Sequence, residues 1–177
     1  FAPDEAAAAW AHFNSKTHTV TVLDRKDRPF STVSTTWVAD RVFITDASLQ
    51  LQTKIIRANS APPAPERRAV LGWMCKTGGG EFIHDGRVIS VRPGDFFMFN
   101  LAGEISGLML DMDVFAIILP HSEIDYDARL HPQGIFLGAE TPEAIAIREM
   151  LETTVALLPG AQRSEAALYA ARARALI

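Results

Sequence analysis

Histidine is the residue type in this chain best suited to hold a metal ion or to transfer a proton near neutral pH. Metal ligands such as imidazole must converge to within about 2.0–2.2 Å of an ion such as zinc. The histidines are scattered along the chain, and their spacing gives no indication that they converge. We therefore predict no bound metal and no cofactor. The five histidines are His12, His18, His84, His121 and His131.

The second candidate for chemistry is Cys75, which is the only cysteine. A reactive thiolate needs a basic neighbour that lowers its pKa. Cys75 instead ends an apolar run, residues 70–75, and the sequence fixes no basic residue beside its thiol. We predict a buried structural thiol. Because one cysteine cannot form an intramolecular disulfide, we also expect a reducing compartment, with the cytoplasm as the default location.

Acid–base catalysis would need a pair such as His with Tyr or Lys. Both tyrosines, Tyr126 and Tyr169, lie beyond the predicted strands, and His84 lies on a predicted turn. We therefore predict that the chain is not an enzyme.

Composition excludes several other classes of protein. The 177 residues are 48% hydrophobic, which is enough for one domain with a real core. The longest apolar run, residues 114–119, is far shorter than the roughly 20 residues of a membrane helix, so we expect a soluble protein with no membrane partner. A net charge of −4 argues against direct nucleic-acid binding by these residues. The first residue is Phe rather than Met, so we expect a fragment of a longer protein.

The elements that must position any site are mainly strands. Short runs rich in Val, Ile and Phe fill residues 17–119 without intervening helices, which indicates a barrel or sandwich. Asp85 and Gly86 predict a tight hairpin turn. The sequence Pro93-Gly94-Asp95 predicts a sharp corner before the strand at residues 96–99.

Helices are predicted at both ends. Acidic and Ala-rich residues predict one over residues 3–14. A Thr-Pro-Glu start at Thr141 predicts another, and residues 164–177 predict a third. An apolar stripe on the middle helix predicts a dimer seam, although packing on the outside of the barrel is the alternative. The stripe consists of Ala144, Ile147, Leu151, Thr154 and Leu158.

Together these features resemble a cupin barrel and, more closely, the N-terminal regulatory domain of AraC/XylS-type transcription factors. The resemblance implies a mainly β fold with C-terminal helices. The fold that it implies is a cupin-like β-barrel (jelly-roll), preceded by an N-terminal helix and followed by a two-helix hairpin. The resemblance implies three parts. They are an N-terminal helix or arm (residues 1–16), a cupin-like β-barrel sensor (residues 17–138) and a helical dimerisation hairpin (residues 139–177). The matching features are Trp10 and Phe13, residues 71–80, residues 85–87, residues 92–95, Leu119-Pro120 and the Thr-Pro-led helix pair.

The resemblance also carries functional expectations. Enzymatic cupins hold a metal with a His-x-His pair, but the matching residues 73–81 and 100–107 contain no histidine. We therefore expect a metal-free barrel that senses a small-molecule effector and a homodimer formed through the C-terminal helices. DNA would be bound only by a downstream domain with two helix-turn-helix units, which is absent from this chain.

Strand alternation suggests which side chains face the barrel interior. Leu71, Trp73 and Cys75 share one face of their strand, and we expect that face to point inward. An apolar lining would suit an apolar or aromatic effector. The predicted ligand-binding residues are Trp37, Phe43, Trp73, Cys75, Phe97, Phe99 and Met109, with Met112 as a further candidate.

Two alternatives to a sensor remain open at this point. The first is a structural dimerisation module whose large side chains simply fill the barrel. The second is a metal-free cupin enzyme. A cavity or a packed interior would distinguish the sensor from the structural module.

Overall fold

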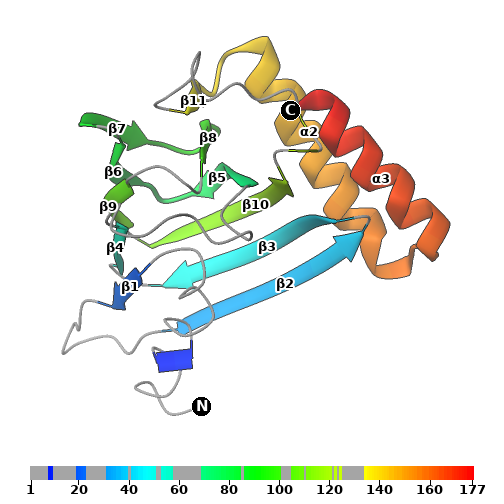
Figure 1. The fold of residues 1–177 in the computed structure, drawn as a ribbon, viewed down its shortest axis with the longest axis horizontal. Helices are drawn as coiled ribbons and strands as arrows, with labels where there is room; N and C mark the ends of the chain where they lie inside the picture. Colours follow the sequence, from blue (N-terminus) through cyan, green and yellow to red (C-terminus); the bar gives the residue numbers. More distant parts are fainter. Residues whose placement is uncertain are drawn as a thin grey trace.

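The fold is described from a computed structural model of the chain (Figure 1). The structure describes residues 8–9, 19–22, 31–39, 41–50, 53–57, 69–84, 86–100, 105–109, 111–120, 122, 124 and 134–177. Ala8 and Ala9 are helical, and the rest of the predicted N-terminal helix lies outside these residues.

The described strands form two antiparallel sheets. Five of them are in the order β1-β4-β9-β6-β7, and six are in the order β11-β8-β5-β10-β3-β2. The first sheet contains β1 (Thr19–Val22), β4 (Thr53–Arg57), β9 (Ile105–Met109), β6 (Gly80–His84) and β7 (Arg87–Val91). The second contains β11 (Ile135–Leu137), β8 (Phe96–Asn100), β5 (Ala69–Thr77), β10 (Met112–Pro120), β3 (Val42–Gln50) and β2 (Ser31–Ala39).

Two helices follow the strands, separated by a short 3₁₀ turn. They are α2 (Pro142–Leu157), η3 (Leu158–Gly160) and α3 (Arg163–Leu176). The predicted start of α2 is confirmed, because the Thr141 hydroxyl accepts a hydrogen bond of 3.2 Å from the backbone N–H of Ala144. At the start of α3, Gln162 and Glu165 form a reciprocal capping box. Both helices lie against the six-stranded sheet on the side away from the other sheet (Figure 1).

The six-stranded sheet therefore separates two hydrophobic cores. The inner core lies between the two sheets, and the outer core lies between the six-stranded sheet and the helices. Strand β5 shows the alternation, since Trp73 and Cys75 belong to the inner core and Met74 belongs to the outer core. The prediction that the Trp73 face points inward is thus confirmed.

The hairpin and the corner predicted from glycine both occur. Gly86 has a φ of 78°, and His84 pairs with Arg87 on either side of the two-residue turn. Asp85 lies outside the described residues. Gly94 has a φ of 89° at the corner between β7 and β8, where a side chain would be strained.

The fold class is confirmed at a coarse level, as a mainly β chain with two C-terminal helices. The strands form two facing sheets, and a single closed barrel is not seen among the described residues. No helix in the described part of the chain is long and apolar enough to cross a membrane.

Candidate functional site

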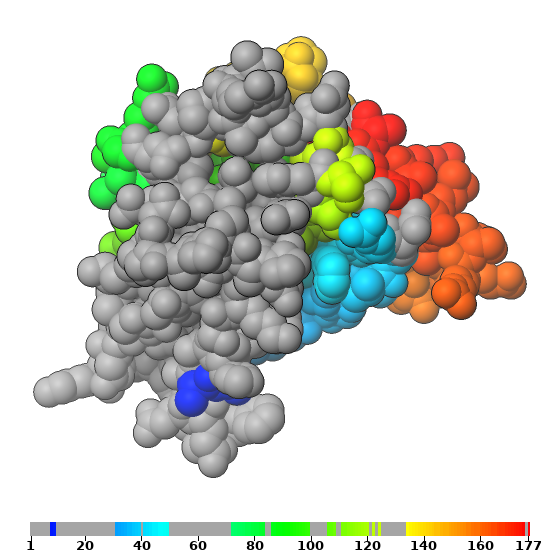
Figure 2. All heavy atoms as spheres, in the orientation of Figure 1, coloured from blue at the N-terminus to red at the C-terminus, as the bar shows by residue number. Residues whose placement is uncertain are grey.

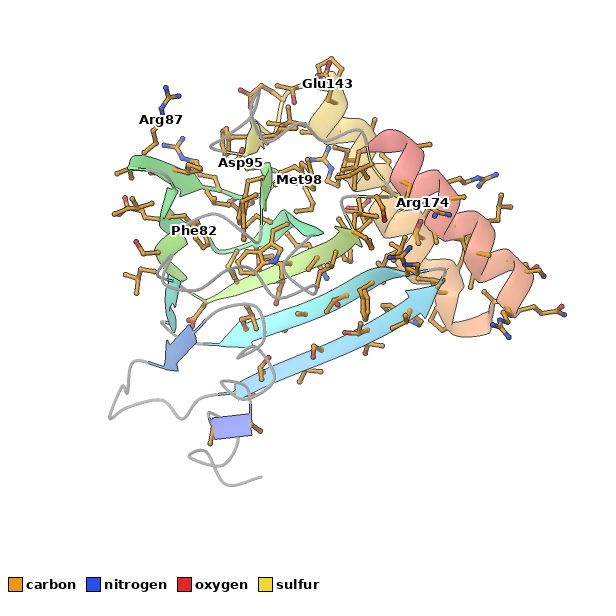
Figure 3. The ribbon with its side chains drawn as sticks, viewed as in Figure 1. Phe82, Arg87, Asp95, Met98, Glu143 and Arg174 are labelled. Atoms are coloured by element: carbon orange, nitrogen blue, oxygen red, sulfur yellow. The ribbon has the colours of Figure 1, made fainter. Side chains whose placement is uncertain are left out.

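Aromatic side chains fill the inner core where a ligand pocket was predicted. The ring of Trp73 lies 5.8 Å from Phe82, 5.4 Å from Phe97 and 6.1 Å from Phe99, in each case edge to face. Phe82 and Phe97 are 5.0 Å apart. Edge-to-face contacts at these distances are favourable and leave the four rings well packed. We refer to Trp73, Phe82, Phe97 and Phe99 as the aromatic cluster, and Figure 3 shows Phe82 between the sheets.

Cys75 lies beside this cluster and is fully buried. Burial, followed by the charges of Asp95 and Asp113, raises the pKa of the Cys75 thiol to about 11. Its Sγ donates a hydrogen bond of 3.4 Å to the backbone carbonyl of Thr77. These features fit the predicted structural thiol, because a raised pKa leaves almost no thiolate at neutral pH.

Other predicted pocket residues do not join the cluster. Trp37 pairs with Ile44 and packs against the outer core, on the opposite face of the sheet from Trp73. Sequence alternation within one strand cannot say which face of the sheet that strand turns inward, and this placement corrects the prediction for Trp37. Phe43 is 40% exposed and lies at the start of β3. Met112 is buried in the inner core, and the side chain of Met109 lies outside the described residues.

The five stripe residues on and after α2 are covered by their own chain. Ala144, Ile147, Leu151, Thr154 and Leu158 are all buried. Ile147, Leu151 and Leu158 pack in the outer core with sheet residues such as Ile44 and Ile117. We predicted that the stripe is a dimer seam, but it faces the sheet. This placement agrees with the alternative, in which the helix packs on the outside of the strands. Leu157 and Leu168 are the large apolar side chains that the helix pair leaves exposed.

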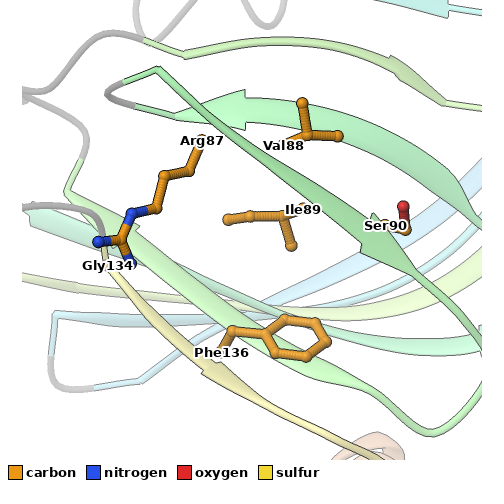
Figure 4. Close-up of a pocket in the computed structure, with 6 residues that line it drawn as sticks. All are labelled: Arg87, Val88, Ile89, Ser90, Gly134 and Phe136. Carbon is orange, nitrogen blue, oxygen red and sulfur yellow. The ribbon is translucent and has the colours of Figure 1, made fainter.

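A slot opens between the two sheets at one side of the molecule (Figure 4). It has a volume of about 270 Å³, and its lining consists of Arg87, Val88, Ile89, Ser90, Gly134 and Phe136. β7 is the last strand of the five-stranded sheet, and β11 is the last strand of the six-stranded sheet. In the part of the chain that the structure describes, the slot therefore lies between two sheet edges. Figure 2 shows part of the β6–β7 hairpin at the surface, far from the helix pair.

The slot leads toward the aromatic cluster. Phe136 pairs with Phe97, which in turn pairs with Trp73, so these three side chains lie on one face of the sheet. Ile89 on β7 is partly buried and packs against the inner core. Sequence reasoning missed Phe136, Ile89 and Phe82. The only signal for them was the alternation of apolar residues in short strands.

The corner at Asp95 connects the strands to the helix pair. Its buried carboxylate accepts hydrogen bonds from the backbone N–H of Arg92 at 2.9 Å and of Ala139 at 3.0 Å. Backbone bonds of 2.8 and 3.0 Å also join Gly94 and Asp95 to Cys75. Because Ala139 lies just before the start of α2, Asp95 fixes the position of that helix relative to β8.

Within the described residues, no three His, Cys, Asp or Glu side chains come together in a way that could hold an ion.

No protein-family model and no curated protein sequence matches this chain. Among solved structures, the AraC-like transcriptional activator CuxR matches with a TM-score of 0.84 and 16% identity, over 96% of this chain. The match covers 63% of the CuxR chain. The chain therefore shares the fold of the part of CuxR that it matches, as the resemblance in the sequence predicted.

Cupin proteins match over smaller parts of the chain. A cupin superfamily protein from Desulfitobacterium hafniense DCB-2 has a TM-score of 0.41 at 16% identity and covers 56% of this chain and 84% of its own. KdgF from a Halomonas species has a TM-score of 0.40 at 12% identity and covers 56% of this chain and 93% of its own. Likeness at this level carries no argument about activity.

Proposed function

We propose that this chain is the regulatory domain of an AraC-type transcription factor. In this role it binds a small effector, forms a homodimer and controls DNA binding by a C-terminal domain that is not part of the chain. It acts in the cytoplasm and is not an enzyme. The observation that carries the proposal is the fold similarity to an AraC-like transcriptional activator over 96% of the chain.

The proposed mechanism is linkage between the strands and the helix pair. An effector that binds one arrangement of sheets and helices better than another shifts the population toward that arrangement. A coupling free energy of ~1–3 kcal/mol would be ordinary for such a device. The Asp95 carboxylate supports this mechanism, because its two hydrogen bonds connect the corner of the sheet to Ala139, in the short segment that leads into α2.

The proposed dimer uses the outward face of the helix pair. The stripe residues are occupied by the sheet, so they cannot also contact a second copy in this arrangement. Leu157 on α2 and Leu168 on α3 remain exposed. Two exposed leucines on neighbouring helices offer apolar surface for a symmetric contact.

A second candidate is the structural dimerisation module. The packed aromatic cluster favours it, because edge-to-face rings occupy the space in which an interior ligand would sit. The two candidates differ in whether any small molecule binds.

The first test is to sequence the reading frame that contains this chain beyond Ile177. The proposal predicts a following domain of roughly a hundred residues with two helix-turn-helix patterns and a net basic charge. A frame that stops near Ile177, or continues into another barrel, would overturn the assignment to a transcription factor.

Sedimentation velocity on the chain itself tests the dimer. A concentration-dependent dimer that is weakened in Leu157→Ala and Leu168→Ala supports the proposed helix face. A monomer at all concentrations, or a dimer that neither change weakens, would contradict it.

A further inference from the structure

The slot lies between the edges of β7 and β11 and is separate from the helix pair and the aromatic cluster. It is bounded by two strands that each lack a neighbour on one side among the described residues. The slot borders the inner core, because Ile89 packs on that core and Phe136 pairs with Phe97. A ligand there would touch both sheets at once.

One wall of the slot exposes an aromatic ring on the face of the sheet that also carries the buried Phe97 and Trp73. Phe136 is 45% exposed, whereas its register partner Phe97 is 2% exposed. Removing apolar area from water is favourable by roughly 25 cal/mol per Å². The exposed ring therefore favours an occupant with an apolar, preferably flat, body.

The charge of the slot is set by Arg87. Its side chain begins on the inward side of β7, like Ile89 and Val91, and its guanidinium lies near Gly134 at one end of the slot (Figure 4). No ion pair is found between Arg87 and any residue that the structure describes. Guanidinium groups bind carboxylates, sulfonates and phosphates with paired, charge-assisted hydrogen bonds. Among the described residues that line the slot, Arg87 is the one charged side chain, so the charge of this lining is complementary to an anion.

We propose that the slot is the effector site of this domain and that it binds a small organic anion with an apolar, ring-sized body. The anionic group pairs with Arg87, and the apolar body lies between Ile89 and Phe136. The volume of about 270 Å³ is near the lower end of the ~300–1,000 Å³ typical of ligand pockets, which limits the ligand to a small molecule. This proposal rests on the proposed sensor function and moves its site from the interior to the sheet edge.

The position of β11 gives this site a route to the helices. β11 ends at Leu137, and Thr141, the N-cap of α2, follows four residues later. Between them, Ala139 donates the hydrogen bond that Asp95 accepts. An anion held between Arg87 and Phe136 would therefore restrain the segment that begins α2.

The test uses the fluorescent dye anilinonaphthalene sulfonate, which joins a sulfonate to aromatic rings, and phenylnaphthylamine, which has the same rings without the charge. Dissociation constants of both dyes are measured by fluorescence titration at low salt. The variants are Arg87→Gln, Arg87→Lys and Phe136→Ala. Matched controls are Arg172→Gln, an exposed arginine on α3, and Val33→Ala, an exposed apolar residue on β2. Circular dichroism establishes that each variant is folded.

We expect Arg87→Gln to weaken sulfonate-dye binding by about tenfold, since charge-assisted hydrogen bonds are roughly twice as strong as neutral ones. Binding of the uncharged dye should hardly change. Arg87→Lys should recover part of the affinity, Phe136→Ala should weaken both dyes, and the two controls should bind like the unmodified chain.

Two results would contradict the proposal that the slot is the binding site. Equal affinity of all variants for the sulfonate dye would place binding elsewhere on the chain, and the sensor function would stand without this site. No binding of either dye by the folded chain would also reject the slot. The reading frame beyond Ile177 would then still decide the regulator assignment by itself.

Discussion

The aromatic cluster and the slot lie between the same two sheets, yet one is closed and the other is open. Phe97 and Phe136 are register partners on adjacent strands and point to the same face, but they are 2% and 45% exposed. β8 lies between β5 and β11, and Phe97 meets Phe82 from the opposite sheet. Among the described strands, β11 has no second neighbour in its sheet, and the slot separates it from the edge of β7. The position of a strand in its sheet therefore decides whether the same residue type fills a core or lines a site.

We expect the largest effect on stability from a substitution inside the aromatic cluster. Phe97→Ala should lower the free energy of unfolding by ~3–5 kcal/mol, because it removes a buried ring and leaves a cavity. Phe136→Ala is the matched change in the slot and should cost less than ~1 kcal/mol. Urea denaturation of both variants measures the difference. An equal loss in the free energy of unfolding for the two variants would contradict the difference in burial between Phe97 and Phe136.

The outer core provides the second comparison, between the two sides of α2. Leu151→Ala should lower the free energy of unfolding by ~2–5 kcal/mol, because Leu151 is buried against the sheet. Leu157→Ala, on the exposed side, should cost less than ~1 kcal/mol and act on dimerisation instead. Denaturation and sedimentation of both variants separate the two effects. A Leu151→Ala variant that dissociates without losing monomer stability would contradict the packing of the stripe on the sheet.

The corner between the strands and the helices is expected to have an intermediate effect. Asp95→Ala leaves the N–H groups of Arg92 and Ala139 without their acceptor, at a cost of ~1–3 kcal/mol. The exposed Glu140→Ala, close by in sequence, is the control. Hydrogen exchange at the start of α2 should rise in Asp95→Ala and stay unchanged in Glu140→Ala. Unchanged exchange in both would remove Asp95 from the proposed coupling.

The smallest expected effect concerns Cys75 in the closed interior. Its folded pKa of about 11 exceeds the ordinary value of 9.0, so the unfolded chain loses this proton at a lower pH than the folded chain does. Stability of the unmodified chain should therefore fall, relative to Cys75→Ala, as the pH rises from about 9 to about 11. Native labelling by a thiol reagent at pH 8 should also be slow. Fast labelling of the folded chain would show that the interior is open.

Local signals in the sequence predicted the local structure well. The Asp-Gly turn, the Pro-Gly-Asp corner and the Thr-Pro start of α2 were all found where expected, because each depends on a few adjacent residues. The alternation in β5 also placed Trp73 and Cys75 on one face correctly. These features follow from backbone preferences that act over short distances.

What the sequence did not reveal depends on pairing between distant segments. The slot exists because β7 and β11 are both edge strands, and strand order is set by contacts between residues far apart in the chain. In the sequence, Arg87 was recognised only as part of the hairpin feature at residues 85–87. Phe136 was not among the residues predicted to bind a ligand. The stripe on α2 was recognised, but its period does not say whether a sheet or a second copy covers it.

A crystal structure of the chain with anilinonaphthalene sulfonate bound would test the proposed slot directly. We expect the dye in the slot, with its sulfonate at Arg87 and its rings against Phe136, while the four rings of the aromatic cluster stay in contact. Dye inside the inner core, with Trp73 and Phe82 moved apart to admit it, would contradict the proposed slot and restore the interior as the binding site.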